Sequence, residues 1–181
     1  MLSYALLGLL ARNPCSGYDL ARLMQQRVNN FWHARHSQIY PTLAQLEAQG
    51  LVSHERVEQE DRPDKKLFSI TEAGQAALQS WVQSPTALTP RRDELLLKAY
   101  SIWLADPQVA AALLRDHAEL HREQMAHYEE KLAYLEQTYA DQKTWPNPLF
   151  CSLAVIRCGI GQERAYAEWC EWMAGELVGH A

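Results

Sequence analysis

The sequence predicts a mainly α-helical chain that contains one small β-hairpin. Two observations predict this class. Apolar residues recur at helical spacing in most segments, from "LSYALLGLLARNP" near the start to the last segment, Pro148 to Leu177. The spacing changes between residues 51 and 71, where "LVSHERVEQ" and "KKLFSIT" are rich in β-branched and aromatic residues and flank the polar turn "EDRPD". The 181 residues leave room for one large domain or two small ones.

The first 84 residues predict three helices, two strands and a fourth helix. The opening helix ends at Asn13-Pro14, and Ser16 can cap a second helix, "SGYDLARLMQQRVNNFW". The third helix is "SQIYPTLAQLEAQGLV", which Gly50 brings to an end. After the two strands, "TEAGQAALQSWV" reads as a helix that Thr71 can cap. This order of elements is that of a winged helix-turn-helix domain over residues 1–84.

The rest of the chain predicts a linker and an all-α domain. "QSPTALTPRRD" carries two prolines and few apolar residues, and residues 85–93 are therefore expected to form the linker. Residues 94–181 then predict a short helix, "DELLLKAYSIWLA", and two long ones. Asp106 can cap the first long helix, with Pro107 at its first position, and "WPNP" separates it from the second.

Two apolar stripes on the long helices predict a dimerisation surface. One follows a coiled-coil-type spacing, and the other continues along the last helix. The two stripes contain Met125, Tyr128, Leu132, Leu135 and Tyr139, and then Leu149, Leu153, Ile156, Ile160, Trp169, Trp172 and Met173. Because narrow stripes alone do not close a core, a second copy of the chain is the simplest partner. An intramolecular three-helix bundle is the alternative.

The third helix has an apolar face and a polar N-terminal end. Ile39, Leu43 and Leu46 follow the spacing of a buried face. In a helix-turn-helix, the N-terminal residues of the second helix meet the DNA. Gln can pair with adenine, Ser and Thr can bond base edges or phosphate, and a Tyr hydroxyl can reach phosphate. The predicted DNA-binding residues at this end are Arg35, His36, Ser37, Gln38, Tyr40, Pro41 and Thr42.

Two alternatives concern the same end of this helix. Pro41 suits the first turn, where its missing N–H has no partner to lose. Tyr40 could instead be a core aromatic residue, with the polar residues only capping the helix. Periodicity favours neither reading of Tyr40 over the other.

The turn between the strands is a second predicted DNA contact. It carries the cations Arg62, Lys65 and Lys66, which can follow the phosphate backbone or enter the minor groove. A solvated turn is the alternative, because four acids lie nearby and would weaken the contact: Glu58, Glu60, Asp61 and Asp64.

The distribution of charge also favours DNA binding by the first half, and the composition favours a cytoplasmic protein. The net charge is −5, yet residues 1–92 hold 10 Lys and Arg against 8 Asp and Glu, and residues 93–181 hold 7 against 14. Such asymmetry indicates a nucleic-acid-facing first half. No apolar run reaches the ~18 residues of a membrane span, and the N-terminus shows no signal-peptide pattern. The four cysteines form no short pair, so we expect reduced thiols in a cytoplasmic protein.

Other chemistry finds little support in the sequence. No phosphate-binding glycine loop, nucleophile elbow or paired-carboxylate pattern appears, so we expect neither an enzyme nor a cofactor. His117 and His121 have metal-ligand spacing, but too few ligands accompany them, and we expect a solvated polar face and no metal. Cys151 and Cys158 are expected to be small core residues rather than redox sensors.

Particular motifs resemble the PadR family of transcriptional regulators. "ALLGLLARNPCSGYDLARLM" is similar to the family's opening, and "SQIYPTLAQLEAQGLV" resembles its Ser-x-Ile-Tyr-Pro signature almost position for position. "RPDKKLFSITEAGQAALQSW" resembles its wing and the following helix, although the acidic "EQEDRPD" stands where glycine-rich residues are usual. "RDELLLKAY" and "ERAYAEW" resemble the helical C-terminal domain of the AphA virulence activators.

The resemblance implies a dimer that binds double-stranded DNA at an inverted-repeat operator, usually as a repressor. Some members release DNA on binding phenolic acids or planar drugs. The aromatic residues Trp103, Trp145, Trp169 and Trp172 suit a flat apolar ligand, but helix packing explains them as well and is favoured. The competing readings are a winged-helix module that contacts only proteins and a metal- or thiol-responsive regulator.

Overall fold

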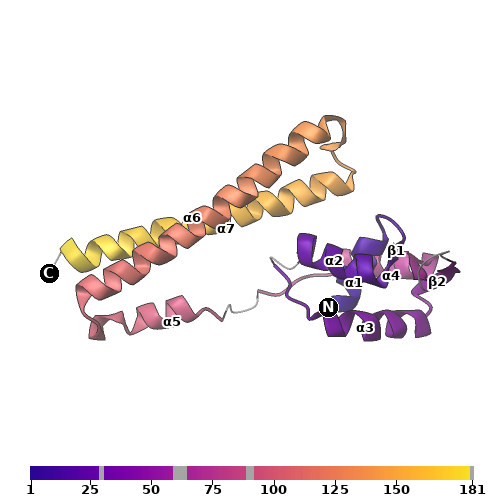
Figure 1. Cartoon of the computed structure of the whole chain (residues 1–181), viewed down its shortest axis with the longest axis horizontal. Helices are drawn as coiled ribbons and strands as arrows, with labels where there is room; N and C mark the ends of the chain where they lie inside the picture. Colours follow the sequence, from indigo (N-terminus) through magenta and orange to yellow (C-terminus); the bar gives the residue numbers. More distant parts are fainter. Residues whose placement is uncertain (29–30, 59–64, 89–91, 180–181) are drawn as a thin grey trace. The chain divides into compact units, whose positions relative to one another are not determined.

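The chain folds into two compact units, residues 1–88 and 89–181. The computed structural model describes residues 1–28, 31–58, 65–88 and 92–179 (Figure 1). The division between the units falls within the segment that the sequence analysis assigned to a linker. The mainly helical class with a small sheet is confirmed, and each unit is described by itself below.

The described residues of unit 1 form four helices and a three-stranded sheet. The helices are α1 (Leu2–Leu10), α2 (Gly17–Leu23), α3 (His36–Ala48) and α4 (Glu72–Gln83), and α2 continues as a π-helical turn, Met24–Val28. The strands are β1 (Cys15–Ser16), β2 (Val52–Val57) and β3 (Lys65–Ile70), in the antiparallel order β1-β3-β2. Strand β1 was not predicted from the sequence, because two residues are too few to show a strand pattern.

Leucine side chains from three helices form the core of unit 1. Leu6 and Leu7 of α1, Leu20 of α2 and Leu43 of α3 are fully or almost fully buried. Each contributes about 1.5–3 kcal/mol through removal of its side chain from water. Ile39 and Leu46 join them from α3. The apolar stripe predicted for the third helix is therefore confirmed, and it fixes which face of α3 points outward.

The start of α4 is docked on the turn that follows α3. The Thr71 hydroxyl accepts from the Gly74 amide at 3.0 Å and donates to the carbonyl of Gly50 at 2.7 Å. Gly50 takes a φ of +69°, which a glycine adopts without steric cost. A Cβ on Gly74 would lie 2.0 Å from the carbonyl oxygen of Leu51, so only glycine fits there. This junction sets how β2 leaves the end of α3.

Unit 2 is built on a pair of long antiparallel helices (Figure 1). Its elements are α5 (Glu94–Tyr100), a 3₁₀ turn Ile102–Leu104, α6 (Pro107–Thr138), a 3₁₀ turn Ala140–Gln142 and α7 (Pro148–Gly179). Asp106 caps α6 as predicted, accepting from the amides of Gln108 and Val109. Among the described residues, none of these helices, nor any in unit 1, is both long and apolar enough to cross a membrane.

The two long helices of unit 2 bury apolar residues against each other within one chain. Leu95 of α5 packs with Leu114 and Ala118 of α6 and with Cys170 of α7 in one core. Further along, the Tyr128 ring lies so close to Gly159 that a Cβ there would be 3.1 Å from its Cε2 atom. The expectation that the two predicted apolar stripes have no partner inside the chain is therefore wrong.

Candidate nucleic-acid interface

The N-terminal end of α3 is a polar surface on a firmly docked helix. The helix starts at His36, and the Gln38 side-chain oxygen accepts from the Arg35 amide at 3.0 Å. The Thr42 hydroxyl donates to the Gln38 carbonyl at 2.6 Å. The first bond satisfies an amide at the helix terminus that has no helical partner, and the second is a bond from a threonine hydroxyl back to the carbonyl four residues earlier. They also hold the polar side chains in defined positions before any ligand arrives.

The structure brings together all the predicted residues of this end. Thr42 is half-buried, and the other members are exposed, namely Arg35, His36, Ser37, Gln38, Tyr40 and Pro41. Pro41 is the sixth residue of α3, so the expectation that it occupies the first turn is wrong. Because proline has no N–H, the Ser37 carbonyl receives no hydrogen bond from position 41.

Tyr40 belongs to this surface and not to the core. Its side chain is 49% exposed. One side of its ring meets Gly17 at the start of α2, and the ring of His36 lies edge-on to it with the centroids 6.0 Å apart. The core-aromatic reading of Tyr40 is therefore wrong. The ring is held from the side, and about half of the residue's surface remains exposed.

The hairpin carries basic side chains near its turn. Lys65 and Lys66 are exposed at the start of β3, while Arg62 lies outside the described residues. Lys66 pairs with Arg56 across the ladder, and Lys65 pairs with Val57. Arg56 was not singled out in the sequence analysis, and its register opposite a lysine becomes evident only once the strands are paired.

Alternation along the strands separates the two lysines. Successive residues of a strand point to opposite faces, so Lys66 shares a face with Phe68, and Arg56 with His54. Phe68 is buried in the core of unit 1, and the His54 ring bonds the Glu47 carboxylate of α3. Lys66 and Arg56 therefore project from the face of the hairpin that is turned toward α3, and Lys65 from the other face.

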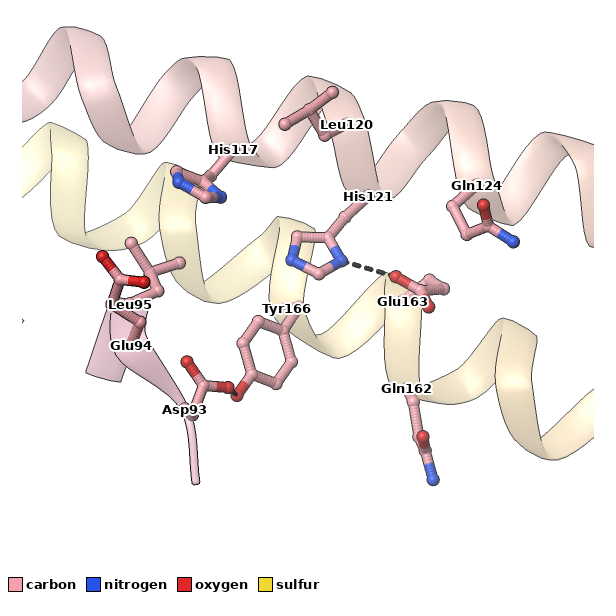
Figure 2. A pocket seen from close by; sticks show the side chains of 10 residues that line it. All are labelled: Asp93, Glu94, Leu95, His117, Leu120, His121, Gln124, Gln162, Glu163 and Tyr166. Carbon is pink, nitrogen blue, oxygen red and sulfur yellow. Dashed lines mark hydrogen bonds and ion pairs between the residues drawn. The ribbon is translucent and has the colours of Figure 1, made fainter. Parts of the chain in front are cut away.

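Unit 2 holds a pocket of about 450 Å³ that is lined mostly by polar residues (Figure 2). The Tyr166 hydroxyl donates to the Asp93 carboxylate, which also caps α5 by accepting from the Leu96 amide. His121 bonds Glu163, and its ring lies against that of Tyr166 with the centroids 4.9 Å apart. This network ties the start of α5 to α6 and α7.

The histidines of this pocket differ from what the sequence predicted. His117 and His121 line the pocket and are half-buried, so they do not lie on a fully solvated face. Among the described residues, no group of three or more potential ligands is arranged for a metal ion. The described residues that line the pocket include Asp93, Glu94 and Glu163 but no lysine or arginine.

The cysteines also differ from the sequence-based expectation. Cys151 and Cys158 are exposed rather than part of the core, and Cys170 is buried. Burial raises the pKa of the Cys170 thiol, with the nearby carboxylates Glu171 and Asp93 adding to the effect. Burial, and then Asp19, raises the pKa of the Cys15 thiol. A raised pKa lowers the thiolate fraction, which makes these two thiols poor redox sensors.

The four tryptophans considered above for a flat ligand do not line the pocket of Figure 2. Trp169 packs against the core of unit 2. The other three, Trp103, Trp145 and Trp172, are exposed on separate segments. Helix packing thus accounts for one of the four.

The stripe residues occupy mixed positions in unit 2. Tyr128, Leu153 and Ile160 are buried, and Tyr139 and Trp172 are exposed. The remaining members are half-buried, namely Met125, Leu132, Leu135, Leu149, Ile156, Trp169 and Met173.

A winged helix-turn-helix unit with an exposed polar end on its recognition helix, and with exposed lysines at the start of β3, is typical of a DNA-binding regulator. Comparison with known proteins agrees. Residues 6–80 match the model of the transcriptional regulator PadR-like family, and residues 91–177 match that of the virulence activator alpha C-term family. The chain is 31% identical over 179 residues to the negative transcriptional regulator PadR of Bacillus subtilis, covering 94% of each chain. It therefore belongs to the PadR family of transcriptional regulators, which are not enzymes.

Solved structures extend this likeness over the whole chain. The crystal structure of B. subtilis PadR in complex with operator DNA has a TM-score of 0.87 at 28% identity and covers 97% of this chain and 98% of that one. The complex of the same protein with p-coumaric acid has a TM-score of 0.69 at 29% identity over the same shares. The Vibrio cholerae virulence activator AphA has a TM-score of 0.76 at 27% identity, with both chains fully covered.

Proposed function

We propose that this regulator is a repressor that binds a pseudo-palindromic operator as a dimer through the N-terminal end of α3. The observation that carries the proposal is the division of α3 between a buried face and an exposed polar end. The relative named above is a negative regulator, and its structure is a complex with operator DNA, which supports the same role here. The predicted contacts are Arg35, His36, Ser37, Gln38, Tyr40, Pro41 and Thr42, with Lys66 and Arg56 of the hairpin as further phosphate contacts.

The dimer is supported by apolar surface that unit 2 leaves uncovered. Leu97, Tyr100, Trp103 and Leu104, in α5 and the turn after it, are all largely exposed, as is Trp172 of α7. Contiguous exposed apolar residues mark interaction surfaces in soluble proteins. The buried members of the two stripes already have partners inside the chain, so the exposed members and the α5 segment are the parts left for a second copy.

We also propose that a small aromatic ligand releases the regulator from its operator. This release is supported by the p-coumaric acid complex of the B. subtilis relative. The pocket of Figure 2 does not suit an aromatic acid, because three carboxylates would repel the ligand's own carboxylate and no described lining residue is a lysine or arginine. We therefore propose that this pocket has a structural role and is not the binding site of the effector.

The direct test is binding to duplex DNA recovered from genomic fragments by the purified chain. Tyr40→Ala should weaken binding to the recovered duplex by ~1–3 kcal/mol, the range for a lost specific contact. Fluorescence anisotropy at fixed salt measures the change, and circular dichroism verifies that the variant is folded. Unchanged affinity in a folded variant would remove Tyr40 from the interface.

A further inference from the structure

We infer that Gly17 is a positioning residue for DNA recognition, because its missing side chain leaves the space in which the Tyr40 ring lies. The inference rests on the proposed function, in which the phenol of Tyr40 contacts the operator. Gly17 touches no DNA in this account. It acts only through the position of the Tyr40 ring.

The geometry leaves no room for a methyl group at position 17. A Cβ there would lie 2.5 Å from Cε1 of Tyr40, 3.2 Å from Cζ and 3.3 Å from Cδ1. Carbon atoms in contact are usually about 3.5–4.0 Å apart, so the ring or the backbone would have to move by about 1 Å. Cζ carries the phenol oxygen, and the movement would therefore displace the group that is proposed to meet the DNA.

The backbone at Gly17 is held from two directions. Ser16 pairs with Leu67 in the sheet, which anchors the residue just before Gly17. The Ser16 hydroxyl accepts from the Asp19 amide at 3.1 Å and caps α2. Leu20, one turn further on, is completely buried in the core. The first turn of α2 therefore has little freedom to retreat from an added methyl group.

The Tyr40 ring is the part that can give way. It is 49% exposed, whereas Ile39 and Leu43 hold α3 itself in the core. A methyl at position 17 should thus push the ring outward, against the neighbouring His36 ring, and leave the helix in place. A displacement of about 1 Å exceeds what a hydrogen bond tolerates, because such bonds span a range of only about 0.5 Å.

The test compares Gly17→Ala with Gly8→Ala in the full chain. Gly8 lies inside α1, and a Cβ there would meet nothing within 4 Å, so it is a matched control. The probes are the duplex recovered from genomic fragments by the wild-type chain and an unrelated duplex of equal length. Gly17→Ala should lower affinity for the recovered duplex about tenfold, and should lower affinity for the unrelated duplex by the same factor as Tyr40→Ala does, because a Tyr hydroxyl that contacts phosphate acts on any sequence. Gly8→Ala should change neither affinity.

A double-mutant cycle shows whether Gly17 acts through Tyr40. In a Tyr40→Ala background the ring is gone, and Gly17→Ala should change affinity less than about twofold. If Gly17→Ala lowers the affinity for the recovered duplex equally in the wild-type and the Tyr40→Ala backgrounds, the inference is overturned. A folded Gly17→Ala chain with unchanged affinity would overturn it as well. A loss on both duplexes that persists in full in the Tyr40→Ala background would mean that Gly17 serves the fold alone.

Thermal unfolding keeps the inference testable if Gly17→Ala is too unstable to assay. Adding Tyr40→Ala should then restore the melting temperature, because the clash is removed, and a double variant that stays unfolded would overturn the inference. If the wild-type chain recovers no specific duplex from genomic fragments, the proposed function is refuted, independently of the role of Gly17. The same unfolding comparison would still decide whether the ring rests on Gly17.

Discussion

The hairpin register predicts that Lys66 and Lys65 contribute unequally to DNA binding. Lys66 and Arg56 share the face that carries Phe68 and His54 and is turned toward α3, whereas Lys65 points the other way. If α3 meets the DNA, Lys66 and Arg56 are placed to reach phosphates beside it. Lys66→Ala and Arg56→Ala should each weaken binding, and Lys65→Ala should have little effect.

The magnitude follows from counterion release. Each lost phosphate contact should make the slope of log affinity against log salt less steep by ~0.9. Raising salt from about 50 to 200 mM is a fourfold change, so one lost contact alters the ratio of the two affinities by about 3.5-fold. Fluorescence anisotropy across this range, on the recovered and on an unrelated duplex, measures the slope. Equal slopes for Lys66→Ala and Lys65→Ala would refute the assignment of faces.

Three further predictions concern stability and reactivity. Gly74→Ala should destabilise unit 1 by about 3 kcal/mol, because its Cβ would meet the Leu51 carbonyl oxygen at 2.0 Å, and urea denaturation beside the Gly8→Ala control checks this. A loss no larger than the control's would contradict it. Tyr166→Phe should cost about 1 kcal/mol by the same assay, because Asp93 loses a hydrogen bond, and no change would mean that Asp93 only caps α5. Iodoacetamide should label the exposed Cys151 and Cys158 well before the buried Cys170 in the native chain, and the reverse order by mass spectrometry would contradict the placement of α7.

Local signals in the sequence predicted most of unit 1. The caps at Ser16 and Thr71 and the stripe of α3 depend on residues three or four positions apart, and such patterns are visible in a single chain. The two-residue strand β1 was missed, because only its pairing with β3 defines it. Pro41 lies in the second turn of α3, because it is the sixth residue from the start at His36, and even a start at Ser37 would have placed it beyond the first turn.

Contacts between distant residues account for what the sequence did not predict. The exposed end of α3 was predicted, but the contact of Tyr40 with Gly17 joins two helices and has no local signature. In the same way, the bonds of Tyr166 with Asp93 and of His121 with Glu163 needed the antiparallel pairing of α6 and α7. That pairing also buries part of the predicted dimer stripe, so removal of residues 149–181 would uncover α6 as well as alter any dimer.

Analytical ultracentrifugation of the full chain with its recovered duplex tests the central claim most directly. The account predicts two 20.7 kDa chains per duplex, on a pseudo-palindrome whose half-sites lie about 34 Å, or a multiple of that, apart. A single chain bound to one half-site, with the free chain sedimenting as a monomer at micromolar concentration, would contradict it.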